Sequence, residues 1–173
     1  MSLDDYFATI ELADPLDNLT SELLDELRTM LDRIHPSRLD RTHSSIAPAA
    51  EGISIEMRHR DDPGLAVGLE AFGVEVVVNY GEEHEHFNVE HEFIDFAVGP
   101  LATEFMVPRI VAFLEALMTG RIELHVTHRF LYVSTVSYWI NDAGERERFL
   151  SGGTVIPTFK WTKEPIVKNF DFR

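Results

Sequence analysis

The sequence feature that most constrains the fold is the alternation of side chains between Gly73 and Phe96, GVEVVVNYGEEHEHFNVEHEFIDF. Four apolar or aromatic residues recur at every second position, which is the period of a β-strand: Val74, Val76, Val78 and Tyr80. A turn is predicted around Gly81, and a second alternating run follows, in which His84 and His86 lie on the face opposite Phe87. The stretch therefore predicts a hairpin with one apolar and one polar face.

Two further segments show the 3.6-residue period of helices. Residues 18–34 repeat apolar side chains at helical spacing, and the following Pro36 ends the helix. Residues 101–119 are apolar around more than half of the helical circumference, which predicts a deeply packed helix, and Gly120 is a natural C-terminal stop. Pro108 within this segment either kinks the helix or is its first residue.

The remaining segments indicate strands and turns. Alternating residues predict a hairpin over residues 53–69, two strands over residues 121–140 and an edge strand over residues 154–161. Residues 36–52 are rich in Pro, Ser, Ala and Gly and predict a loop, long enough to include a short helical turn. We expect residues 1–173 to form a single α+β domain, in which a twisted antiparallel sheet of about six to eight strands packs against two long helices.

The charge balance limits the classes of partner. The chain carries 30 acidic against 15 basic side chains, a formal charge of −15. Phosphate backbones and anionic lipid surfaces would be repelled, so binding to nucleic acid or to a membrane surface is not expected. The acidity has two interpretations: it serves solubility alone, or it attracts a basic partner protein.

Several sequence signals are absent. The chain has no cysteine, which excludes disulfides, thiol catalysis and cysteine-based zinc sites. The first 19 residues lack the basic and apolar segments of a signal peptide, and no apolar run approaches the roughly 18 residues that span a bilayer. We therefore expect a soluble cytoplasmic protein. Neither a P-loop nor a G-x-S-x-G or HExxH motif occurs, so no catalytic residue and no cofactor is predicted.

One cluster has the residue types of a metal site. His84, His86 and Glu90 project from the same face of the second strand of the hairpin, in the pattern His-x-His-x3-Glu. A fourth ligand would come from His125 or His128. This interpretation predicts a metal-binding protein or a metal-dependent enzyme. The simpler alternative is an exposed polar strand face within an acidic patch.

A family resemblance adds a second hypothesis. The run VVVNYGEEHEHF, followed by an apolar helix that ends in ALMTGRIELHV, resembles patterns in immunity proteins of bacterial polymorphic toxin and contact-dependent inhibition systems. The resemblance covers about residues 73–140. It implies a small, cytoplasmic, non-enzymatic protein that binds a cognate toxin domain and blocks its active site or substrate groove. Acidic immunity proteins often face basic, nucleic-acid-directed toxins, which agrees with the charge of −15.

The partner-binding residues predicted by this hypothesis are the acids of the hairpin stretch and one aromatic residue: Glu82, Glu83, Glu85, Glu90, Glu92, Asp95 and Trp139. The acids would steer a basic toxin towards the surface, and an aromatic centre would anchor it. A third interpretation is a housekeeping interaction module whose acidity serves only solubility. The oligomeric state stays open.

Overall fold

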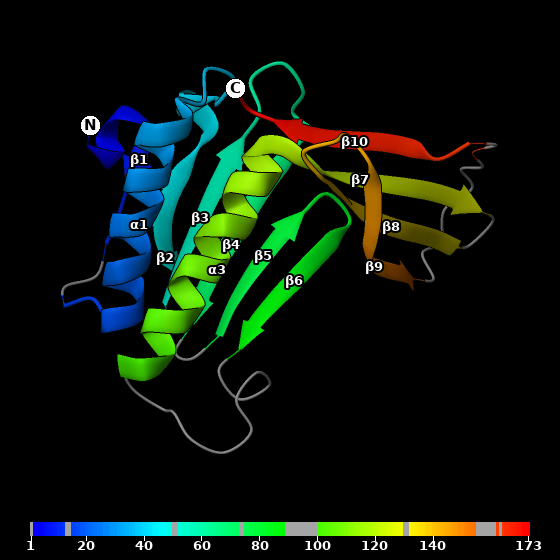
Figure 1. The fold of residues 1–173 in the computed structure, drawn as a ribbon. Coiled ribbons are helices and arrows are strands. Elements are labelled where there is room, and N and C mark those ends of the chain that lie inside the picture. The colour runs from blue at the N-terminus through cyan, green and yellow to red at the C-terminus, as the bar shows by residue number, and fades with distance from the viewer. Residues whose placement is uncertain are drawn as a thin grey trace.

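The computed structural model describes residues 2–12, 15–49, 52–72, 75–88, 100–129, 132–154, 162 and 164–173. Two long helices lie on one face of a six-stranded sheet, and a second sheet of four strands lies beside it (Figure 1). The predicted α+β class and the two helices are confirmed. The prediction of one sheet with six to eight strands is only roughly met, because the described residues contain ten strands divided between two sheets.

Helix α1, Asn18–Ile34, begins at the N-cap Asp17, whose carboxylate accepts a hydrogen bond from the Thr20 amide at 2.8 Å. Its apolar stripe is buried, as the periodicity predicts, and comprises Leu19, Leu23, Leu24, Leu27, Met30 and Leu31. The helix ends at His35, which takes a left-handed conformation (φ 48°) directly before Pro36.

The large sheet contains six strands in chain order: β1 Thr9–Ile10, β2 Ser45–Ala49, β3 Gly52–Arg58, β4 Ala66–Phe72, β5 Glu75–Tyr80 and β6 Glu83–Asn88. Strand β1 is parallel to β2, and all other neighbours are antiparallel. The β3–β4 pairing confirms the predicted hairpin over residues 53–69, and the β5–β6 pairing confirms the one around Gly81.

Strand β2 corrects the prediction of a loop over residues 36–52. A short 3-10 helix, Arg41–His43, does occur there, but Ser45–Ala49 pair with β3. Pro48 argued against a strand, because proline cannot donate a hydrogen bond to a ladder. The sheet accommodates it because β1 pairs only with Ser45 and Ile46, so Pro48 lies beyond the end of β1.

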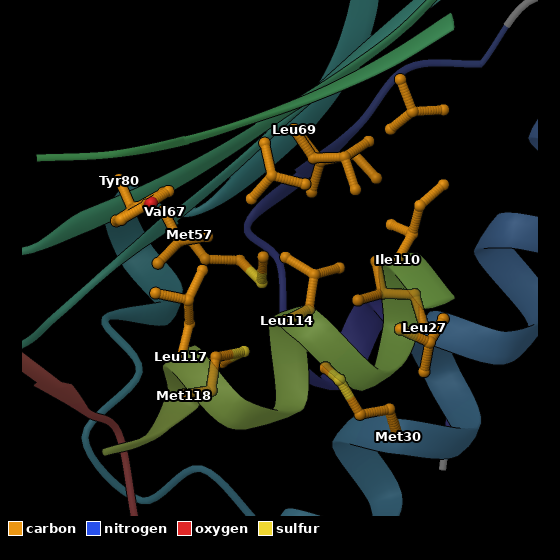
Figure 2. Close-up of a cluster of buried hydrophobic side chains, with 14 of the residues drawn as sticks. Leu27, Met30, Met57, Val67, Leu69, Tyr80, Ile110, Leu114, Leu117 and Met118 are labelled. Atoms are coloured by element: carbon orange, nitrogen blue, oxygen red, sulfur yellow. The ribbon is translucent and has the colours of Figure 1, made fainter. Parts of the chain in front are cut away.

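Helix α3, Pro100–Met118, lies beside α1 on the same face of the large sheet (Figure 1). Figure 2 shows buried side chains of both helices and of the sheet in one hydrophobic cluster: Ile110, Leu114, Leu117 and Met118 from α3, Leu27 and Met30 from α1, and Met57, Val67, Leu69 and Tyr80 from the sheet. Pro108 lies inside the helix and is not its first residue. No helix in the described part of the chain is both long enough and apolar enough to cross a membrane.

The small sheet has the strand order β10-β7-β8-β9 and is antiparallel throughout: β7 Thr119–Arg129, β8 Tyr132–Ile140, β9 Arg146–Thr154 and β10 Ile166–Asp171. Helix α3 leads directly into β7, and Gly120 (φ 71°) supplies the predicted helix stop. The predicted edge strand over residues 154–161 lies outside the described residues, apart from Thr154, which belongs to β9.

Candidate functional site: an aromatic groove beside the β5–β6 hairpin

The β5–β6 hairpin sends alternate side chains to opposite faces of the large sheet. Tyr80 is paired with Glu83 on the face that the helices cover, and Glu85 follows on the same side. His84 and His86 lie on the opposite face and are exposed. Glu83 and Glu85 therefore lie on the face opposite to His84 and His86, with which they alternate in the sequence.

The turn of this hairpin packs directly against the small sheet. Gly81 has a positive φ of 61°, and a Cβ there would lie only 2.9 Å from Leu124 Cδ2 and 3.4 Å from the ring of Phe170. Only glycine combines this backbone conformation with so close an approach. The hairpin is thus fixed at the junction between the two sheets.

Polar groups link the sheets at this junction. The hydroxyls of Tyr80 and Ser137 lie 3.2 Å apart, and the Thr135 hydroxyl donates a hydrogen bond to the Glu83 carboxylate. Burial raises the pKa of Tyr80 to about 12. Burial also raises the pKa of Glu83, and the nearby carboxylates of Glu82 and Glu85 add to this effect.

An aromatic groove of about 350 Å³ opens next to these groups, between the hairpin, helix α3 and the small sheet. Its lining is mainly aromatic, with one acid and one base: Glu85, Phe87, Arg109, Ala112, Phe113, Trp139 and Phe149. The Phe113 ring makes edge contacts with Phe87 and Phe149, at centroid distances of 5.7 and 6.3 Å. The groove is therefore a mainly apolar surface with one acid and one base at its border.

A β-bulge places Phe149 at this groove. Ser137 pairs with Leu150 and Tyr138 with Arg148, so Phe149 is the extra residue of β9 and faces no partner in β8. Bulges redirect a side chain relative to regular alternation and are frequent beside functional sites. Phe149 is 41% exposed and is one of five large hydrophobic residues that are exposed in the described part of the chain.

The predicted partner-binding residues have different surroundings. Glu85 and Trp139 meet at the groove, although they are far apart in the sequence. Glu83 lies at the sheet junction, and Glu82 forms an ion pair with Lys168 at 3.0 Å. The other three predicted acids, Glu90, Glu92 and Asp95, lie outside the described residues.

Sequence reasoning missed several residues of the groove. Phe113 and Arg109 belong to a helix that was assigned to the core as a whole, and the bulge at Phe149 has no local sequence signal. One signal was available: Phe149 is a large apolar residue that follows the charged run Glu145–Arg148, where a buried strand is not expected.

The predicted metal ligands are only partly brought together. The rings of His84 and His86 lie 4.9 Å apart, whereas Glu90 falls outside the described residues. Among the residues that the structure describes, no group of three or more His, Asp or Glu side chains could hold a metal ion. His125 and His128 therefore do not complete a site with His84 and His86.

His125 instead belongs to a charged cluster on the small sheet. Its Nε2 atom lies 3.3 Å from Glu123, and its ring lies 4.7 Å from that of Tyr138. The Arg146 guanidinium donates to the same carboxylate at 2.7 Å. Arg146, followed by His125, holds the pKa of Glu123 below its usual value.

Comparison with protein-family models, with curated proteins and with solved structures finds no match. The aromatic groove and the hairpin beside it are therefore the observations from which a function can be inferred.

Proposed function

We propose that this protein binds and neutralises a basic protein toxin domain, in the manner of a bacterial immunity protein. The observation that carries the proposal is the aromatic groove, which unites Glu85, Trp139 and Phe149 on one surface. In this binding mode an apolar side chain of the toxin enters the groove, and the toxin's basic residues face the acidic hairpin.

The lining of the groove suits a protein anchor. Aromatic residues dominate the energetics of protein interfaces because they bury a large area with few rotatable bonds. Phe113 and Trp139 pack partly against the hydrophobic core, so their positions are set before binding. Phe149 is the most exposed aromatic residue of the groove, so a partner can bury the most additional surface there. The groove thus supports anchoring at low entropic cost.

The charge of the chain supports a basic partner. A formal charge of −15 attracts a positively charged protein over a distance and raises its association rate. Close to the surface, screening limits each interaction to roughly 8 Å at physiological salt, so the acids next to the groove matter most. Glu85 borders the groove itself, and Glu83 lies two residues away on the same strand face.

The experiment is a growth-rescue assay paired with a binding measurement. Candidate basic toxin domains are induced one at a time in a bacterial host, with and without this protein. Phe149→Ser removes an exposed anchor from the groove. Tyr132→Ser is the matched control. Tyr132 is also 41% exposed and also lies in the small sheet, but its side chain is on the other face of β8 from Trp139.

We expect the wild-type protein and Tyr132→Ser to restore growth and Phe149→Ser to fail. Loss of one anchoring aromatic costs about 2 kcal/mol, which corresponds to roughly 30-fold weaker binding in a surface plasmon resonance assay. Equal rescue by both variants would exclude the groove as the toxin-binding site. Failure of the wild-type protein to bind any basic toxin domain would favour an interaction module whose acidity serves only solubility.

A further inference from the structure

The face of the large sheet that the helices leave uncovered carries a pair of neighbouring histidines. His84 is paired in register with Asn79, and His86 with Val77, so both imidazoles project from the same side of β6. Their ring centroids are 4.9 Å apart and their planes are inclined by 75°. Both side chains are exposed, that of His86 by 52%. Two imidazoles so close together can be reached by one solvent ion.

A carboxylate on the neighbouring strand orients one of these rings. His86 Nδ1 lies 2.5 Å from Glu75 Oε1, across the β5–β6 ladder. Because a carboxylate only accepts hydrogen bonds, Nδ1 must carry a proton, and in the neutral ring the lone pair of Nε2 is then available to a metal ion. A histidine held through one nitrogen by a carboxylate, with the other nitrogen free, is the usual arrangement of a metal-ligating histidine.

We propose that His84 and His86 form a binding site for a divalent transition-metal ion such as Zn²⁺, with Glu75 as the residue that positions His86. Imidazole nitrogens are preferred ligands for Zn²⁺, Ni²⁺ and Cu²⁺ and poor ligands for Mg²⁺ and Ca²⁺. Since the described residues offer no third His, Asp or Glu ligand, water completes the coordination in this proposal. Such an open, two-histidine site binds its ion reversibly. It is independent of the toxin-binding groove, which lies on the other face of the hairpin.

Glu75 distinguishes this site from the pattern in the sequence. The motif His-x-His-x3-Glu directed attention to Glu90 as a ligand, whereas the structure places Glu75 at the His86 ring. Glu75 is only 26% exposed, so its carboxylate is held close to the sheet rather than extended into solvent. The contact with Glu75 fixes the His86 ring, so less conformational entropy is lost when the ion binds.

The test is calorimetric titration of tag-free protein with ZnCl₂. We expect one ion per chain, with binding lost in both His84→Ala and His86→Ala. Glu75→Gln keeps the size of the side chain but removes its charge, and it should weaken binding by roughly 10- to 100-fold. His43→Ala is the matched control, because His43 is also exposed and also contacts a carboxylate, that of Asp40, at 2.7 Å.

Circular dichroism of each variant before titration checks that the fold is retained, as expected for substitutions on an exposed sheet face. Binding that survives in His84→Ala or in His86→Ala would overturn the site. Absence of binding in the wild-type protein, or a loss equal to theirs in His43→Ala, would do the same. An unchanged affinity in Glu75→Gln would remove the positioning role of Glu75. None of these results depends on a toxin, so they leave the proposed function untouched.

Discussion

The hydroxyl groups of Tyr80 in β5 and Ser137 in β8 lie 3.2 Å apart and join the two sheets across the core. Both side chains are completely buried. The Tyr80 ring also makes edge contacts with Phe113 and Phe170, at centroid distances of 5.6 and 6.0 Å. One residue of the hairpin therefore contacts helix α3 and two strands of the small sheet.

Removing this hydroxyl should weaken the junction between the sheets. Tyr80→Phe keeps the ring contacts but leaves Ser137 without its partner, so we expect the free energy of unfolding to fall by about 1 kcal/mol. Urea denaturation measures this difference. Tyr132→Phe is the control, since Tyr132 is exposed and its substitution should change stability by less than about 0.5 kcal/mol. Equal effects would show that the buried hydrogen bond contributes nothing.

The Glu83 carboxyl should make the fold more stable in mild acid. Its pKa in the folded state is raised by burial above the ordinary 4.5 of glutamate, so the folded state binds the proton more tightly than the unfolded chain. Its contribution to stability is greatest below the unfolded value and is lost as the pH rises through the folded pKa. Glu83→Gln, which carries no charge, should therefore have a larger free energy of unfolding than wild type at pH 7, and this difference should vanish towards pH 4. A difference that does not vary with pH would contradict the prediction.

Glu123 should show the opposite dependence on pH. Arg146 and His125 lower the pKa of Glu123 in the folded state. The contribution of the carboxylate to stability is therefore complete above pH 4.5 and is lost as the pH falls through the folded pKa. We expect Glu123→Gln to lower the free energy of unfolding by about 1–2 kcal/mol at pH 7, as for the loss of a hydrogen bond to a charged group. Denaturation curves at pH 7 and pH 3 check this, with a smaller loss expected at pH 3.

Charge removal beside the groove should slow the association with a basic partner. Glu85→Gln is expected to reduce the association rate several-fold and to make it less dependent on salt, with a smaller effect on dissociation. Glu26→Gln changes the net charge by the same amount on the exposed side of α1, and it should leave the rate nearly unchanged. Stopped-flow measurements at two ionic strengths separate the variants. Identical rates for both would assign the attraction to net charge alone.

Local periodicity was sufficient to predict much of the fold. The stripe of α1, its end before Pro36 and the register of the β5–β6 hairpin all follow from residues close in the sequence. The division into two sheets does not, because it depends on which strands pair after the turn at Gly120. Strand β2 was missed because Pro48 is tolerated only where the short β1 has already ended.

The candidate site was predictable only in its hairpin half. Glu85 was identified from the acidic stretch and Trp139 from its residue type, but their proximity depends on the packing of the two sheets. Phe113 and Phe149 come from segments with different periodicities, and the bulge that exposes Phe149 is a property of the β8–β9 pairing. The role of Glu75 beside His86 likewise requires the cross-strand register.

The continuity of α3 with β7 has a mechanical consequence. Phe113 at the groove, Leu114 in the core and Ile122 in the small sheet belong to one uninterrupted run of helix and strand. In the proposed complex the toxin would lie against Phe113, on the run of chain that joins the helix packed on the large sheet to the first strand of the small sheet. The complex should then resist hydrogen exchange along the whole seam between the sheets, far beyond the residues that the toxin touches, and should open there less often than the free chain.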